Sequence, residues 1–197
     1  RKYLIANLLP QFSLSLESLM DCDPLLELFA HDHDEVWLEI GFGAGEHIAK
    51  QALLNPKIGF IGCEPFINGV ANLLSLIDEN RLTNILIYND DSGPFLNFVP
   101  DGSIGRIFLL FPDPWPKKKH HKRRLVSQES LRQFSRILAD GGEFRFASDH
   151  VEYADWVAHN FSECQDFYKI SKKILENDDR PDGWISTRYE HKAVQRG

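Results

Sequence analysis

Residues 35–45 read EVWLEIGFGAG, a short run of strand-favouring residues that ends in three closely spaced glycines. The first part of the run is nearly continuously apolar, which suits a strand that is buried on both faces of a sheet. A glycine-rich turn after such a strand lets the backbone approach a bound ligand before a helix begins. The stretch therefore predicts an α/β domain with a ligand site at its first turn, although a plain strand-to-helix connection has the same pattern.

The same alternation of strand and helix continues outward from this stretch. Four more strands are expected, at 58–63, 84–88, 105–111 and 142–148. Helices are expected at 45–54, 66–79, 127–138 and 151–161. Such alternation predicts a mainly parallel central sheet with helices on both faces. One or two helices are expected within 1–34 and an antiparallel strand beyond Asp166, so that residues 1–197 form one domain.

The helix expected at 127–138 has a recognisable start. Ser127 is a suitable N-cap, and the acid in the first turn is favoured by the helix dipole. Ser130 stands where a capping box needs Glu or Gln. The sequence therefore predicts an N-cap without a capping box.

Charge is distributed unevenly along the chain. The 22 Lys and Arg residues face 29 Asp and Glu residues, which gives a net charge of −7. Six of those 22 cations lie together in 117–124, which reads KKKHHKRR. Because this run lies between a strand and a capped helix, we favour a phosphate-binding role over a merely solvated face.

Composition excludes several classes of protein. The three cysteines contain no C-x-x-C pair, which argues against a disulfide framework or a zinc site and indicates a reducing compartment. No apolar stretch approaches the ~20 residues of a membrane span, and no basic-then-apolar leader is present. We therefore expect a soluble, cytoplasmic protein. Since the chain begins at Arg1 rather than Met, some natural N-terminal sequence is expected to precede it.

The glycine-rich turn has an unusual charge for a nucleotide site. Gly41, Gly43 and Gly45 follow the pattern G-x-G-x-G, not the G-x-G-x-x-G of dinucleotide enzymes. Glu39 precedes the turn and Glu46 follows it, and carboxylates are poor neighbours for a pyrophosphate. A cationic ligand without phosphate, such as S-adenosylmethionine, fits better, and a nicotinamide oxidoreductase is disfavoured.

Polar residues also follow the next two strands. Glu64 ends the second strand, where a carboxylate can accept both ribose hydroxyls. Asn89, Asp90 and Asp91 follow the third, where they can bond the amino edge of adenine. Each acid alone could be a helix-start or turn residue. Because the carboxyl ends of parallel strands meet at one edge, the set together favours a methyl-donor site.

The fourth strand ends in FPDPWP at 111–116, directly before the basic run. Proline on each side of Asp113 stiffens the backbone and fixes the direction of its carboxylate. Trp115 offers a surface on which a base can stack, or it is a core residue beside a rigid turn. Its place next to six cations favours the first reading.

Several of these stretches together resemble the bacterial tRNA (guanine-N7)-methyltransferases. The matching stretches are EIGFGAG at 39–45, FPDPWPKK at 111–118, HHKRR at 120–124 and TRYE at 187–190. The likeness extends over nearly the whole chain, and PDPW joined to the basic run is its most specific part. The glycine-rich turn is shared with most S-adenosylmethionine-dependent enzymes.

The resemblance implies a Rossmann-like class I methyltransferase fold. It also implies an enzyme that moves a methyl group from S-adenosylmethionine to N7 of a guanine in the variable loop of tRNA, forming 7-methylguanosine. The partner would be tRNA, and neither a metal nor a membrane is implied. The protein would be a cytoplasmic monomer or homodimer.

The resemblance also assigns roles to residues at matching positions. The donor contacts are Glu39, Glu64, Asp90 and Asp113, with Asp113 also the catalytic residue. The substrate contacts are Lys117, Asp149, Thr187, Arg188, Tyr189 and Glu190. The RNA contacts are Lys119, His120, His121, Lys122, Arg123 and Arg124. Asp91 stays open as the alternative to Asp90, and Lys119 stands where many relatives have Arg.

Methyl transfer to guanine N7 is expected to need positioning of the two reactants rather than removal of a proton. N7 of guanine has a free lone pair at neutral pH, so catalysis is expected to rest on alignment and electrostatics. Asp113 would stabilise the positive charge that passes to the purine, and Asp149 would hold a guanine N–H. Two other classes stay open: a DNA or protein amino-methyltransferase with Asp-Pro-Trp as its amino-binding turn, and a non-catalytic RNA-binding module.

Overall fold

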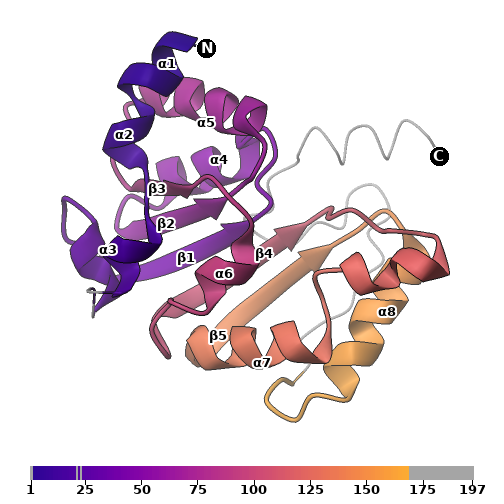
Figure 1. Ribbon diagram of the computed structural model, residues 1–197. Helices are drawn as coiled ribbons and strands as arrows, with labels where there is room; N and C mark the ends of the chain where they lie inside the picture. The colour runs from indigo at the N-terminus through magenta and orange to yellow at the C-terminus, as the bar shows by residue number, and fades with distance from the viewer. Residues whose placement is uncertain (1, 21, 23, 169–197) are drawn as a thin grey trace.

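The structure is a computed structural model that describes residues 2–20, 22 and 24–168. Its strands form one sheet (Figure 1): β1 (Glu35–Ile40), β2 (Ile58–Cys63), β3 (Ile85–Tyr88), β4 (Ile104–Leu110) and β5 (Leu138–Ala147). All five are parallel, in the order β3-β2-β1-β4-β5. The mainly parallel sheet is therefore confirmed. The antiparallel strand expected beyond Asp166 falls almost wholly on 169–197, outside the described residues, and stays a prediction.

The chain enters the sheet through a run of short helices rather than the one or two expected. They are α1 (Lys2–Asn7), α2 (Leu9–Phe12), α3 (Leu16–Met20) and the 3₁₀ helix η1 (Leu25–Leu28). The later helices are α4 (Glu46–Leu54), α5 (Ile67–Asn80), α6 (Ser92–Leu96), the 3₁₀ helix η2 (Lys118–Arg123), α7 (Gln128–Ile137) and α8 (Val151–Ser162). Among the described residues, no helix is long and apolar enough to cross a membrane.

Helices cover both faces of the sheet (Figure 1). The apolar side chains of β1 are divided between two buried clusters. On one face, Leu38 belongs to a buried cluster with α7 and α8, in which Phe134 and Tyr153 are fully buried. On the other face, Trp37 packs in a second cluster with α4 and α5, which includes Leu73. The helices α1 and α2 add partly buried residues to this second cluster.

The start of α7 corrects one expectation from the sequence. Ser127 is the N-cap as expected, and its hydroxyl accepts a hydrogen bond from the backbone N–H of Ser130. The Ser130 hydroxyl in turn accepts from the backbone N–H of Ser127 at 2.9 Å. A capping box is therefore present, because a serine hydroxyl here does the work usually done by Glu or Gln.

Candidate functional site

The centre of the sheet has the geometry of a ligand crevice. β1 and β4 are neighbours, and the helices that follow them, α4 and α7, lie on opposite faces. Ligands of open α/β sheets bind outside the carboxyl ends of the strands at such a point. Because all the strands are parallel, the acids at these ends lie along one edge: Glu39, Glu64, Asp90, Asp113 and Asp149.

The glycine-rich turn between β1 and α4 depends on its glycines. Gly41, Gly43 and Gly45 have φ values of 71°, 58° and 81°, in the left-handed region that other residues rarely adopt. A Cβ atom on Gly45 would also lie 2.7 Å from Cβ of Leu73 in α5. The turn is thus held close against α5, with its backbone at the carboxyl edge.

Glu64 fixes this turn to the next one. Its Oε2 accepts a hydrogen bond from the Gly43 backbone N–H at 2.9 Å, and its Oε1 accepts from the Phe66 N–H at 2.9 Å. Each carboxylate oxygen has a second lone pair, so both remain able to accept from a ligand hydroxyl. A groove opens beside Glu64, lined by Gly43, Ala44, Glu64, Phe66, Asn68, Gly69 and Asn72.

The mouth of this groove carries an aromatic residue that sequence reasoning missed. Phe66 is 74% exposed and is the N-cap residue of α5, where it forms no side-chain cap. A large apolar side chain at a position that favours Ser, Thr or Asp was the available signal. An exposed ring at a groove offers a flat surface for a heterocycle.

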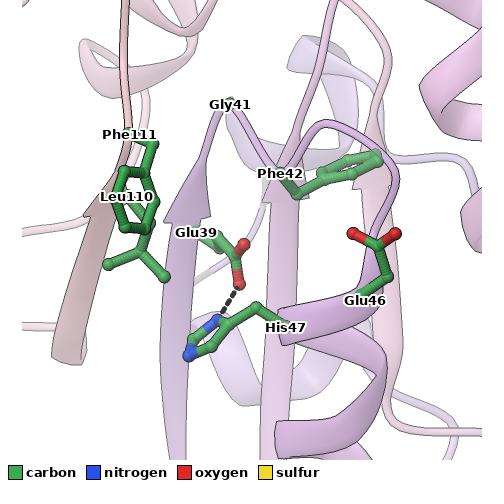
Figure 2. A pocket seen from close by; sticks show the side chains of 7 residues that line it. All are labelled: Glu39, Gly41, Phe42, Glu46, His47, Leu110 and Phe111. Atoms are coloured by element: carbon green, nitrogen blue, oxygen red, sulfur yellow. Dashed lines mark hydrogen bonds and ion pairs between the residues drawn. The ribbon is translucent and has the colours of Figure 1, made fainter. Parts of the chain in front are cut away.

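A second, smaller pocket lies between the ends of β1 and β4 (Figure 2). It is lined by Glu39, Gly41, Phe42, Glu46, His47, Leu110 and Phe111. Nδ1 of His47, in the first turn of α4, lies 2.6 Å from Oε2 of Glu39, and both residues are buried. Figure 2 shows the other Glu39 oxygen turned away from His47, toward the glycine-rich turn. Sequence reasoning missed His47 because a single helical histidine carries no signal.

The polar side chains after β3 differ in their roles: some hold the backbone, and others are exposed to solvent. The Asn89 side-chain amide donates to the Glu64 backbone oxygen at 2.8 Å. Oδ1 of Asp91 accepts from the Gly93 N–H at 2.8 Å and caps α6. Asp90 is exposed, with Oδ1 accepting from the Asp91 N–H. Because Asp91 serves as the cap, this arrangement favours Asp90 as the acid that faces a ligand.

The loop after β4 is held in an unusual backbone conformation. Phe111 and Trp115 have φ values of 51° and 45°, and they flank the exposed Asp113 on both sides. Left-handed backbone in non-glycine residues is sparsely populated, and such strain clusters at active sites and ligand clamps. The local backbone therefore supports Asp113 as a functional residue.

Most of the basic run is available to a ligand. Within 117–124 the exposed cations are Lys117, Lys118, Lys119, Lys122 and Arg123, whereas His120 and His121 are half-buried. The Arg123 guanidinium carbon lies 4.8 Å from the centroid of the Trp115 ring, and His120 meets that ring edge-on at 5.8 Å. The half-buried Trp115 therefore already has two protein partners, and η2 and the Asp113 loop are in contact.

Arg124 corrects the sequence-based prediction of an RNA contact. Its side chain is 0% exposed, so it presents no surface to a phosphate. Instead its Nε donates to the Pro114 carbonyl at 2.9 Å and its Nη2 to Glu152 of α8 at 3.1 Å. The guanidinium carbon lies 5.0 Å from the centroid of the Tyr153 ring and 5.1 Å from that of the Trp156 ring. Arg124 is thus a brace between the Asp113 loop and α8.

The other predicted substrate residues are only partly described. Lys117 is exposed directly before η2, and Asp149 is exposed two residues after β5. Thr187, Arg188, Tyr189 and Glu190 lie outside the described residues. Across the part of the chain that the structure describes, no group of three or more His, Cys, Asp or Glu side chains could hold a metal ion.

Comparison with known proteins agrees with this geometry. A family model described as a putative methyltransferase matches residues 33–197. The tRNA (guanine-N(7)-)-methyltransferase of Agrobacterium fabrum is 45% identical over 98% of this chain and 83% of that protein. The protein of the same name from Rhodospirillum rubrum is 42% identical over 100% of this chain and 78% of that protein.

Solved structures of methyltransferases share the fold. The 16S rRNA methyltransferase KamB superposes with a TM-score of 0.54 at 19% identity, covering 72% of this chain and 74% of that one. Precorrin-6y C5,15-methyltransferase from Geobacter metallireducens gives a TM-score of 0.54 at 14% identity, covering 70% and 65%. At such low identity the likeness shows a Rossmann-like methyltransferase fold and nothing finer.

Proposed function

The chain belongs to the tRNA (guanine-N(7)-)-methyltransferase family, and we propose that it methylates N7 of a guanine in the variable loop of tRNA with S-adenosylmethionine as donor. The observation that carries the proposal is the position of Asp113. It lies between an edge of the sheet lined by acids and a helix of exposed cations. One side suits a cationic donor, and the other suits a polyanionic acceptor.

The donor side suits S-adenosylmethionine in its charge and in the polar and aromatic groups that line it. The groove beside Glu64 and Phe66 has the acceptors and the ring that an adenosine needs. The pocket at Glu39 is lined by the first residues of the same glycine-rich turn, and it would provide a carboxylate for the ammonium group of the methionine part. No Lys or Arg among the described residues lines either pocket.

When bound, S-adenosylmethionine supplies a methyl group on a positively charged sulfur, and the electron pair of the broken C–S bond stays with that sulfur. The lone pair of guanine N7 forms the new bond, so no proton has to be removed. Positive charge therefore moves from sulfur to the purine. The Asp113 carboxylate would stabilise this charge, at a direction fixed by Pro112, Pro114 and the brace from Arg124.

The acceptor side would hold tRNA by its backbone and its target base. The exposed cations at 117–123 would bind phosphates, and Lys117 is the one nearest in sequence to Asp113. Asp149 would accept a guanine N–H, and 187–190 would add further contacts to the base. Because N7 in folded tRNA is not freely accessible, the target base is expected to leave its stack on binding. We further propose that the protein is a cytoplasmic monomer or homodimer.

One experiment tests this function. The purified protein is incubated with S-adenosylmethionine labelled in its methyl group and an unmodified tRNA transcript, and the digested nucleosides are identified by mass spectrometry. We expect labelled 7-methylguanosine, mapped to the variable loop by chain cleavage at the modified base. Label on an exocyclic amino group would indicate an amino-methyltransferase instead. tRNA binding without donor binding would indicate an RNA-binding module.

A further inference from the structure

A chain of hydrogen bonds runs along one side of α4 and ends at Glu39. Nδ2 of Asn55 donates to Oε1 of Gln51 at 3.2 Å. Nε2 of Gln51 lies 3.3 Å from Nε2 of His47, whose Nδ1 lies 2.6 Å from Oε2 of Glu39. His47, Gln51 and Asn55 are four residues apart, so they share one face at the helix surface.

The direction of this chain is set at its far end. Because the side-chain oxygen Oε1 of Gln51 accepts from Asn55, the side-chain nitrogen Nε2 of Gln51 faces His47. A side-chain amide nitrogen can only donate. Nε2 of His47 is therefore the acceptor, and the ring proton is on Nδ1, where it donates to Glu39. Glu39, His47 and Gln51 are only 4%, 5% and 6% exposed, so bulk water does not replace these donors.

We propose that His47 is a positioning residue for the methyl donor, acting through Glu39. The bond from Nδ1 holds Oε2 of Glu39, and Oε1, which has no partner among the described residues, is left for the donor's ammonium group. The His47 ring is itself fixed by an edge contact to Phe108, with centroids 4.7 Å apart. This inference rests on the proposed function, because it assigns Glu39 to the methionine part of S-adenosylmethionine.

The chemistry of this chain of hydrogen bonds explains why histidine suits this position better than lysine or arginine. Asn55 and Gln51 are neutral, and His47 donates through a ring that carries a single proton. A lysine or arginine would hold Glu39 equally well, but it would cancel the charge that attracts the cation. Neutral donors stabilise the buried carboxylate and leave its negative charge to the ligand.

Two variants separate the donor atom from the volume of the ring. His47→Asn keeps an N–H donor at the position of Nδ1, whereas His47→Leu keeps apolar volume without a donor. By calorimetry in the absence of tRNA, we expect His47→Asn to bind S-adenosylmethionine within about threefold of wild type. We expect His47→Leu to bind roughly tenfold or more weakly, as for losing a hydrogen bond to a charged group. In steady-state kinetics the loss in His47→Leu should appear in KM for the donor rather than in kcat.

The double variants with Glu39→Gln show whether His47 acts through Glu39. In the Glu39→Gln background, His47→Leu should have little further effect on donor affinity. Wild-type affinity in His47→Leu, equal losses in His47→Asn and His47→Leu, or an undiminished loss in the Glu39→Gln background would each overturn the proposal. If wild-type protein does not bind S-adenosylmethionine at all, the proposed function itself fails.

A measurement on the wild-type protein needs no variant to fold. Nitrogen NMR distinguishes a ring nitrogen that carries a proton from one that does not. We expect His47 to carry its proton on Nδ1, with Nε2 unprotonated. A proton on Nε2 instead would reverse the direction of the chain and overturn the proposal.

Discussion

The two sides of the candidate site are held in place by different means. On the donor side, the turns after β1 and β2 are joined by Glu64, and the left-handed positions of the first turn are glycines. On the acceptor side, the loop after β4 places Phe111 and Trp115 at positive φ. One buried cation, Arg124, ties this loop to α8.

The difference suits the proposed function, in which one sheet edge serves two ligands of opposite charge. Backbone N–H groups and the His47 side chain hold the acids of the donor side, which in the proposed function attracts a cationic ligand. The acceptor side buries one cation to hold the loop and exposes the others to solvent. A change on one side should therefore leave the function of the other side intact, and the predictions below test this.

The largest effect is expected at the centre of the site. Asp113→Asn removes the carboxylate that we propose faces the developing charge, and turnover should fall by roughly 100-fold or more. Because Asp113 is exposed, the thermal unfolding midpoint should not change. Methyl transfer to tRNA and a thermal melt measure both, with Asp78→Asn on α5 as the matched control. Near wild-type transfer would make Asp113 only a turn residue.

On the donor side, Glu64→Ala removes the acceptor for two backbone N–H groups and for the ribose. Donor binding should weaken by about 1–3 kcal/mol, as for losing hydrogen bonds to a charged group. Calorimetry with S-adenosylmethionine measures this, and Glu79→Ala, exposed at the other end of α5, is the control. An unchanged dissociation constant would remove Glu64 from the donor site.

On the acceptor side, Arg124→Gln shortens the brace and leaves the Pro114 carbonyl without its donor. Turnover at saturating substrates should fall by roughly tenfold, and the free energy of unfolding by about 1–3 kcal/mol. Steady-state kinetics and urea unfolding test this against Arg132→Gln, an exposed site on α7. If Arg124→Gln changes only the affinity for tRNA, Arg124 contacts RNA after all.

The smallest effect is expected from the exposed cations. Changing Lys119 and Lys122 to Gln should weaken tRNA binding several-fold. Each lost phosphate contact should also lower the slope of log K against log salt by roughly 0.7–0.9. Affinity for tRNA at several salt concentrations tests this, with Lys57→Gln, before β2 at the opposite edge, as control. Parallel lines for the two proteins would mean that the lysines only solvate a surface.

Continuous apolar runs were enough to predict the strands from the sequence to within a few residues, and helical spacing and capping residues predicted α4, α5, α7 and α8. The residues at 142–148 gave only part of β5, which begins at Leu138, since the glycines at its start resemble a turn. The helix α6 was missed for a similar reason, because Gly93 and Pro94 lie within it. Local composition predicts a strand best where both of its faces are buried, because nearly every side chain must then be apolar.

The sequence predicted those parts of the candidate site in which a residue type has a single common role. Acids at strand ends and a glycine-rich turn pointed to the edge of the sheet at which both pockets lie. The run KKKHHKRR, in contrast, suggested that every cation faces solvent. Only tertiary packing shows that Arg124 turns inward, toward Tyr153 and Trp156, which follow it by 29 and 32 residues on α8. His47 was hidden for the same reason, because its partner Glu39 is on a different element.

The separation of the two sides is tested most directly by donor affinity in the absence of tRNA. Calorimetric titration of S-adenosylmethionine into wild type, Glu64→Ala and Arg124→Gln compares one variant from each side. The structure predicts a weakening of about 1–3 kcal/mol for Glu64→Ala and an affinity within about twofold of wild type for Arg124→Gln. Equal losses in both variants would contradict it, because the brace on the acceptor side would then also shape the donor site.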